Sequence, residues 1–168
     1  MKKIGILVED LFNEQELYYP YHRLREEYEV ILLGTKKDVE YTSKAGLSIK
    51  SELATKDIKA EELEGLVIPG GYSPDYMRRC EDTVKLVQEL DKMKKPIAAI
   101  CHGPWVLASS CDLKGKKVTS FYSIKDDVIH CGATWVDEEV VRDGHIITSR
   151  TPKDLPEFMK EFIKAIEE

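Results

Sequence analysis

Long hydrophobic runs are missing from this chain of 168 residues. No apolar stretch approaches the ~18–20 residues that a membrane-spanning helix needs, so we expect no membrane partner. The stretch Met1–Asp10 begins with the charge of a signal peptide, but its apolar part ends at an acidic pair and no small-residue cleavage site follows. We therefore interpret this stretch as the first core strand of a cytoplasmic protein.

Cysteine pairs with the spacing of metal sites or redox motifs are also missing. The four cysteines are Cys80, Cys101, Cys111 and Cys131, without a C-x-x-C pair and without a histidine-rich cluster beside them. The pair Gly70-Gly71 does not match a phosphate-binding fingerprint. We therefore expect no metal and no cofactor. Free thiols are expected in a reducing compartment, with a structural disulfide as the alternative.

Basic charge is scarce. Lys and Arg together number 25 against 31 Asp and Glu, which gives a net charge of −6 and argues against nucleic acid as a partner. The one basic cluster, Lys114–Lys117, is short and typical of a solvated turn. The length suits a single domain over residues 1–168, with enough apolar residues (42%) to bury a substantial core.

Apolar strands alternate with amphipathic helices along the chain. The patterns predict strands at 3–8, 29–33, 66–68, 96–100 and 118–121, hairpins at 39–49 and 140–148, and helices at 14–27, 83–94, 105–110 and around 158–166. This alternation predicts an α/β fold with a parallel sheet between helices. Ligands of such sheets bind beyond the carboxyl ends of the strands, where the loops at 10–16, 69–71 and 101–102 fall.

A cysteine and a histidine directly follow one of these buried strands. Residues 98–105 read Ala-Ala-Ile-Cys-His-Gly-Pro-Trp, the pattern of a strand, a sharp turn and a helix start. Helix amides and the positive end of a helix dipole favour a thiolate, so Cys101 is predicted to be a nucleophile. The alternative is a small buried apolar residue. If His102 faces the thiol, it serves as the general base.

Further candidates lie in neighbouring loops. Asp75 is the leading group to orient the His102 ring, with a helix cap as its alternative. Gly70 and Gly71 let backbone amides approach a ligand, and the Gly71 amide opposite the His102 amide would form an oxyanion hole. Arg150, at a strand end, could bind an anionic substrate group, with a surface salt bridge as the alternative.

Several motifs, in order along the chain, resemble the DJ-1/PfpI family and most closely its intracellular protease branch. They are AAICHGP at 98–104, IPGG at 68–71, YPYHRL at 19–24, IKDD at 124–127, GATWVD at 132–137 and SRTPKDL at 149–155. The resemblance implies a flavodoxin-like three-layer sandwich with a mostly parallel central sheet. It also implies that Cys101 is a strained elbow nucleophile. His102 would pair with an acidic residue of a neighbouring subunit, at the position of Asp75, in a homo-oligomer (dimer or hexamer).

One position departs from the family pattern. The family places a glutamate in the loop after the first strand, within hydrogen-bond reach of the cysteine. Alignment on Tyr19–Tyr21 puts Asn13 at that place, flanked by Glu14 and Glu16. An Asn amide can donate a hydrogen bond to a thiolate but cannot transfer a proton. Either Glu14 takes over, or the acid/base chemistry is weaker here than in relatives.

The resemblance leaves two classes of function open. The first is a cysteine-dependent hydrolase, either a peptidase or amidase or a glyoxalase or deglycase, in which Cys101 attacks a small carbonyl compound or a peptide. The second is a non-enzymatic redox-sensing or chaperone-like stress protein, in which Cys101 is oxidised. The pairing of His102 with an acidic residue favours the enzyme, because a simple sensor needs no general base.

Overall fold

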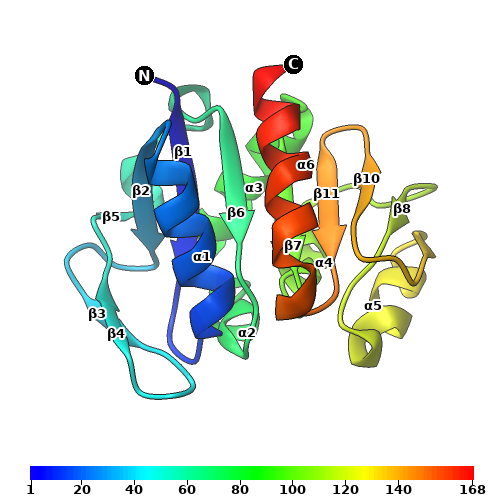
Figure 1. Cartoon of the computed structure of the whole chain (residues 1–168), viewed down its shortest axis with the longest axis horizontal. Coiled ribbons are helices and arrows are strands. Elements are labelled where there is room, and N and C mark those ends of the chain that lie inside the picture. Colours follow the sequence, from blue (N-terminus) through cyan, green and yellow to red (C-terminus); the bar gives the residue numbers. More distant parts are fainter.

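A seven-stranded sheet forms the centre of the molecule, and the computed structural model describes all 168 residues around it. The strands are β1 (Lys3–Val8), β2 (Glu29–Gly34), β5 (Leu53–Ala54), β6 (Gly65–Ile68), β7 (Ile97–Ile100), β10 (Val141–Asp143) and β11 (Ile146–Ser149). Their order is β10-β11-β7-β6-β1-β2-β5 (Figure 1). Every neighbouring pair is parallel except β10 with β11. The predicted mostly parallel sheet is confirmed.

Helices cover both faces of this sheet. They are α1 (Glu14–Arg25), α2 (Ser73–Met77), α3 (Glu81–Lys92), α4 (Pro104–Ser110), α5 (Lys125–His130) and α6 (Leu155–Glu167). α1 and α6 lie in front of the sheet in the view of Figure 1 and share one apolar cluster with it. α2, α3, α4 and α5 contribute to a second apolar cluster. The arrangement is the three-layer, flavodoxin-like sandwich that the resemblance implies.

The two strands β6 and β7 contain no polar side chain because both of their faces are buried. In β7, Ala98 and Ile100 pack in the layer of α1 and α6, whereas Ile97 and Ala99 pack in the layer of α3 and α4. A parallel strand covered on both faces has this unbroken apolar sequence, in contrast to the alternation of a half-exposed strand. The short apolar runs of the sequence therefore identified the sheet correctly.

The loops that carry the candidate residues leave the sheet at one edge. Ile68 of β6 pairs with Ala99 of β7, so these two strands end side by side. Their carboxyl ends lead into Pro69-Gly70-Gly71 and into Cys101. Parallel sheets bind ligands at this edge.

The smaller elements differ more from the prediction. The hairpin predicted at 39–49 is present as β3 (Glu40–Thr42) with β4 (Ser48–Lys50). The predicted strand at 118–121 is wrong. Only β8 (Lys117–Val118) is a strand, and it pairs with β9 (Thr134–Trp135) outside the main sheet. The physical reason is that Phe121 N–H donates to the carbonyl of Cys101 (2.8 Å), so the chain bends toward Cys101 instead of continuing as a strand.

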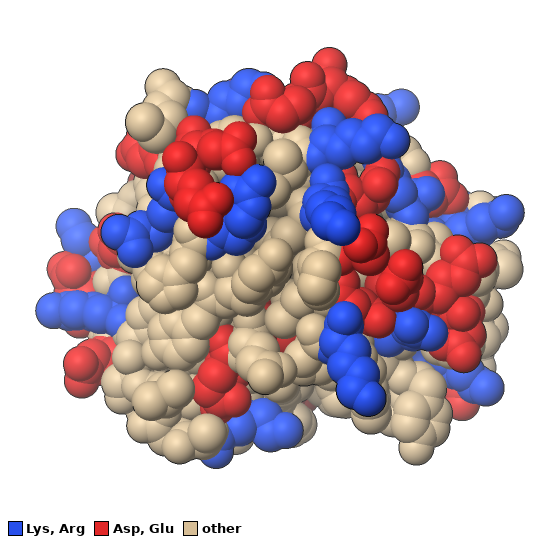
Figure 2. Space-filling model, viewed as in Figure 1, with Lys and Arg blue, Asp and Glu red and all other residues tan.

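Charged side chains of both signs lie interspersed on the face shown in Figure 2, and no broad basic area forms there. This mixture agrees with the small negative net charge of −6. None of the helices combines the length and the apolar character that crossing a bilayer would require.

Candidate active site

Cys101 occupies a strained turn between β7 and α4. Its φ of +62° lies in the left-handed region, which costs a non-glycine residue about 1–3 kcal/mol and is seen at functional sites. Both of its backbone groups are fixed, since the N–H donates to Ser149 (3.0 Å) and the carbonyl accepts from Phe121 (2.8 Å). Gly103 completes the turn, where a Cβ would lie 2.6 Å from the carbonyl oxygen of Ile68. These hydrogen bonds and the close packing at Gly103 therefore fix the backbone conformation of Cys101 and, with it, the direction of its side chain.

Two backbone amides face the Cys101 sulfur, those of Gly71 and His102. An oxyanion hole would need two backbone donors placed in this way. The expectation of a thiolate at rest is wrong, however. Burial, and next the charge of Glu16, raise the pKa of Cys101 to about 12, although the two amides act to lower it. Desolvation thus outweighs the helix terminus, and the thiol needs a base before it can attack.

The ring of His102 faces the thiol. Its Nδ1 lies 3.4 Å from the Cys101 sulfur, and its Nε2 lies 3.4 Å from the Ser123 hydroxyl. The ring stacks on Phe121, with centroids 5.1 Å apart. Burial lowers the pKa of His102, so the imidazole is neutral at pH 7 and one ring nitrogen can accept a proton.

A buried carboxyl, Glu16, completes this group of side chains. Its Oε1 accepts a hydrogen bond from the Gly70 amide (2.9 Å), while Oε2 has no hydrogen-bond partner. Burial raises the pKa of Glu16 to about 7, although the Gly70 bond and the Cys101 thiol act to lower it. Gly70 is required here because a Cβ would lie 2.6 Å from Oε1. A carboxyl whose pKa lies near 7 can both give and take a proton at neutral pH.

Asn13 does not hold the carboxyl position that the alignment assigned to it, and Glu14 does not take that position over. Asn13 caps α1, since its Oδ1 accepts from the Glu16 amide (3.2 Å). The Glu14 carboxylate points to the β3–β4 hairpin and accepts from the Ala45 amide (2.6 Å). Slight burial acts to raise the pKa of Glu14, but its hydrogen bonds keep that pKa below the usual value. The carboxyl beside the cysteine is Glu16, because two further residues of helix rotation carry it to the buried face.

Asp75 does not contact His102 within the chain. It lies inside α2, so the alternative of a helix cap is wrong, because the N-cap position belongs to Tyr72. Its carboxylate forms an ion pair with Arg79 (2.5 Å) one turn further along.

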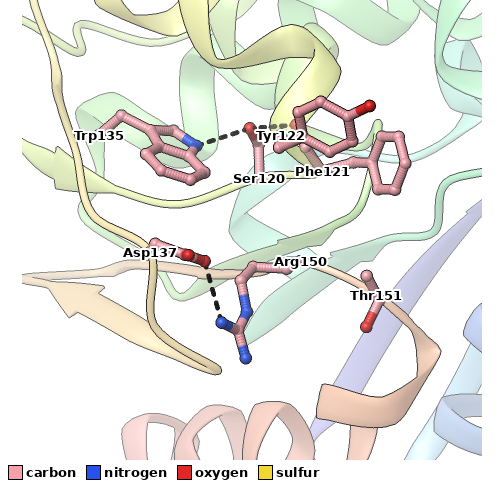
Figure 3. A pocket seen from close by; sticks show the side chains of 7 residues that line it. All are labelled: Ser120, Phe121, Tyr122, Trp135, Asp137, Arg150 and Thr151. Atoms are coloured by element: carbon pink, nitrogen blue, oxygen red, sulfur yellow. Dashed lines mark hydrogen bonds and ion pairs between the residues drawn. The ribbon is translucent and has the colours of Figure 1, made fainter.

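Arg150 lies outside the cavity that contains Cys101. Figure 3 shows its guanidinium directed at Asp137 (3.0 Å), and a second carboxylate, Asp154, binds it through two oxygens (3.0 and 3.1 Å). Hydrogen bonds to Asp154 and then Asp137 raise the pKa of Arg150. The structure therefore favours the salt bridge over the substrate-binding role. The pocket in Figure 3 adjoins the Cys101 cavity, with which it shares Phe121 and Thr151.

The Cys101 cavity has a volume of about 310 Å³. Besides Cys101, His102 and Glu16, its walls include Asn13, Gly71 and Lys44. A cavity of this size suits a small molecule.

A family model described as the DJ-1/PfpI family matches residues 2–165. The chain belongs to the DJ-1/PfpI family. A deglycase of Pyrococcus abyssi (strain GE5 / Orsay) is 42% identical over 164 residues, covering 98% of this chain and 99% of that protein. The deglycase PfpI of Pyrococcus furiosus is 43% identical over 165 residues, covering 98% and 99%. YraA of Bacillus subtilis (strain 168), whose name proposes a cysteine protease, is 39% identical over 166 residues, covering 98% of each.

Solved structures of the DJ-1/PfpI family have the same fold. A two-domain protein of Anabaena variabilis, with DJ-1/ThiJ/PfpI-like and ferritin-like domains, matches with a TM-score of 0.95 at 40% identity. That match covers 98% of this chain and 48% of the other, so this chain spans about half the length of that protein. DJ-1beta of Drosophila melanogaster matches with a TM-score of 0.91 at 25% identity, covering 99% and 91%.

Proposed function

We propose that this protein is a cysteine-dependent enzyme of the glyoxalase or deglycase type, acting on small dicarbonyl compounds and the groups they modify. One observation carries the proposal. The Cys101 sulfur, the Gly71 and His102 amides, the His102 ring and the buried Glu16 carboxyl meet at one cavity of about 310 Å³. The size of this cavity suits a small carbonyl compound better than a folded peptide chain, and the names of two archaeal relatives support the same class.

The first step follows from the neutral thiol and the neutral ring. His102 accepts the thiol proton while the Cys101 sulfur forms a bond to the aldehyde carbon of methylglyoxal. The former carbonyl oxygen gains negative charge, and the Gly71 and His102 amides stabilise it. His102 then returns the proton to this oxygen, and the product of the step is a hemithioacetal on Cys101.

Glu16 is the residue for the second step. It removes the proton from the sulfur-bearing carbon and returns a proton to the neighbouring carbon. The proton of the hydroxyl group moves to the oxygen of that neighbouring carbon, and the hemithioacetal becomes a thioester. Water then hydrolyses the thioester, and lactate leaves as the thiol is restored. Methylglyoxal and lactate differ by one water, so the cycle requires no oxidant or reductant.

The raised pKa of Cys101 supports the enzyme over the redox sensor. Peroxide reacts with the thiolate, and a pKa of about 12 leaves little thiolate at neutral pH. An enzyme with His102 at 3.4 Å from the sulfur can remove the proton when the substrate arrives. A redox sensor without a substrate has no step that requires a base beside the thiol.

Lactate formation from methylglyoxal tests the proposal. We expect lactate from the wild type, none from Cys101→Ala, and a loss of about 10²-fold or more for His102→Ala, because general-base catalysis contributes that much. Cys80→Ala is the control, since Cys80 lies at the start of α3 outside the cavity. Absence of lactate from the wild type would reject the proposal. The same variants assayed on peptide and amide substrates would then test the hydrolytic alternative.

His102 also has a free side that a second subunit can complete. Its Nε2 meets only the Ser123 hydroxyl at 3.4 Å. The aromatic rings nearby are exposed, Tyr72 by 42% and Tyr122 by 70%, and Asp75 lies on the same helix turn as Tyr72. These features support a homo-oligomer in which Asp75 of one subunit orients His102 of another.

Mixed oligomers test this arrangement. Asp75→Ala is expected to lower turnover at least about tenfold, because a misoriented base transfers protons poorly. Co-expression of Asp75→Ala with inactive Cys101→Ala chains should restore activity, since a mixed pair contains one intact site. Differently tagged chains allow the mixed species to be purified. A lack of restoration, or full activity of Asp75→Ala alone, would show that Asp75 does not act across subunits.

A further inference from the structure

Lys44 is a cation without an ion-pair partner in the wall of the Cys101 cavity. No other Lys or Arg lines that cavity, and none of the ion pairs of the chain includes Lys44. Burial raises the pKa of Glu16 to about 7, so the one carboxyl in the cavity is largely neutral below that pH. Of the residues that line the cavity, none then balances the positive charge of Lys44; the charged Glu14 carboxylate, whose pKa Lys44 helps to lower, lies outside the cavity wall.

The hairpin that carries Lys44 is fastened to the loop after β1. The backbone N–H of Lys44 donates to Phe12 (3.0 Å), and the amide of the next residue, Ala45, donates to the Glu14 carboxylate (2.6 Å). Leu11 N–H donates to the carbonyl of Thr42 (2.7 Å). These bonds hold the β3–β4 hairpin beside the cavity. They also give Glu14 a structural task, which is to position the segment that bears the lysine.

We propose that Lys44 selects carbonyl compounds that bear a carboxylate, by pairing with that group while Cys101 faces the carbonyl carbon. An ammonium group is a compact point charge that suits a carboxylate. The net charge of −6 repels anions from the molecule as a whole. Any attraction of an anion to the cavity must therefore come from the local charge of Lys44. The substrate class rests on the proposed function, whereas the preference of the cavity for anions does not.

Two alkylating reagents of nearly equal size separate charge from reactivity. Iodoacetate is an anion and iodoacetamide is neutral, and both transfer a two-carbon group to the Cys101 sulfur with loss of iodide. The rate of each reaction is followed by mass spectrometry of the peptide that contains Cys101. Any change in the thiol pKa affects both rates alike and cancels in their ratio. The ratio of the iodoacetate rate to the iodoacetamide rate therefore reports the charge of the cavity.

The ratio is expected to fall about three- to tenfold in Lys44→Met, as loss of a unit charge several ångströms away predicts. Lys44→Arg should retain it. The matched control is Lys50→Met, because Lys44 and Lys50 are both exposed lysines of the same hairpin and only Lys44 lines the cavity. High salt should lower the wild-type ratio and leave that of Lys44→Met almost unchanged.

An unchanged ratio in Lys44→Met would overturn the proposal, and so would an equal fall in Lys50→Met. The iodoacetamide rate shows whether each variant keeps a folded site. The test needs no turnover, so it remains informative if methylglyoxal yields no lactate. Lactate formation with an unchanged ratio would reject only the role of Lys44.

Discussion

Glu16→Gln is expected to lose turnover and, above neutral pH, to gain stability. The loss should be about 10²-fold or more, because glutamine cannot transfer the proton that the proposed second step requires. Glutamine nevertheless has the same shape, and its carbonyl oxygen can still accept the hydrogen bond of the Gly70 amide. Turnover and stability change in opposite directions because a carboxyl can transfer a proton, whereas burying its charged form is unfavourable for folding.

The gain in stability depends on pH in a defined direction. Burial raises the pKa of Glu16 from 4.5 to about 7, so between these values the folded protein binds more protons than the unfolded chain. The free energy of unfolding therefore falls as the pH rises through this window, by about 3 kcal/mol in total for this residue. Glutamine removes that loss. We expect equal melting temperatures near pH 4 and, at pH 8, a melting temperature for Glu16→Gln higher by about 5–10 °C.

Thiol chemistry provides a third measurement for this variant. The charge of Glu16 is the second cause, after burial, of the raised pKa of Cys101. Glu16→Gln should therefore react faster with iodoacetamide above pH 7 while forming less lactate. A variant that is merely misfolded would not combine these changes with a higher melting temperature.

Glu9→Gln is the matched control. Burial also raises the pKa of Glu9 to about 7, but this residue contacts Thr35 rather than the cavity. It should share the stabilisation at high pH and keep the turnover of the wild type. If Glu16→Gln keeps its turnover and pH profile, the assignment of Glu16 to the second step is wrong.

The elements that build the site were visible in the sequence because they depend on local patterns. The buried strand before Cys101, the turn and the following helix were all predicted, and the structure adds that the φ of Cys101 is +62°. The hairpin at 39–49 was also predicted. Short elements were not, since β5 and β9 contain two residues each and have no period to detect.

The carboxyl beside the cysteine was misassigned because its position depends on the phase of a helix. Asn13 caps α1, and the buried face of that helix includes Glu16, Leu17, Pro20 and Leu24. In the sequence, Leu17 and Leu24 mark the apolar face of this helix, and Glu16 lies on that face one residue before Leu17 and two turns before Leu24. Lys44 carried no comparable signal, because its approach to the cavity depends on backbone bonds between the hairpin and the loop after β1.

Gly71→Ala is expected to damage the fold and the oxyanion site together. Gly71 has a φ of +72°, and a Cβ there would clash with the carbonyl oxygen of Leu11 and lie 2.6 Å from the nitrogen of Asn13. The clash involves backbone atoms, which cannot rotate away as a side chain can. We expect a loss of about 3 kcal/mol or more in the free energy of unfolding. The loop after β1 must move as a result, and with it the Asn13 cap of the helix that carries Glu16.

Gly115→Ala separates this steric effect from the cost of the backbone conformation. Gly115 has a similar φ of +75°, but nothing lies within 4 Å of its Cβ position. Its substitution should cost only about 1 kcal/mol and leave turnover intact. Gly71→Ala should in addition lose about 10²–10³-fold in kcat, because its amide faces the Cys101 sulfur where the oxyanion forms. Denaturant unfolding and lactate formation measure the two effects. Equal unfolding free energies for the two variants, or unchanged kcat in Gly71→Ala, would show that this loop does not set the geometry of the nucleophile.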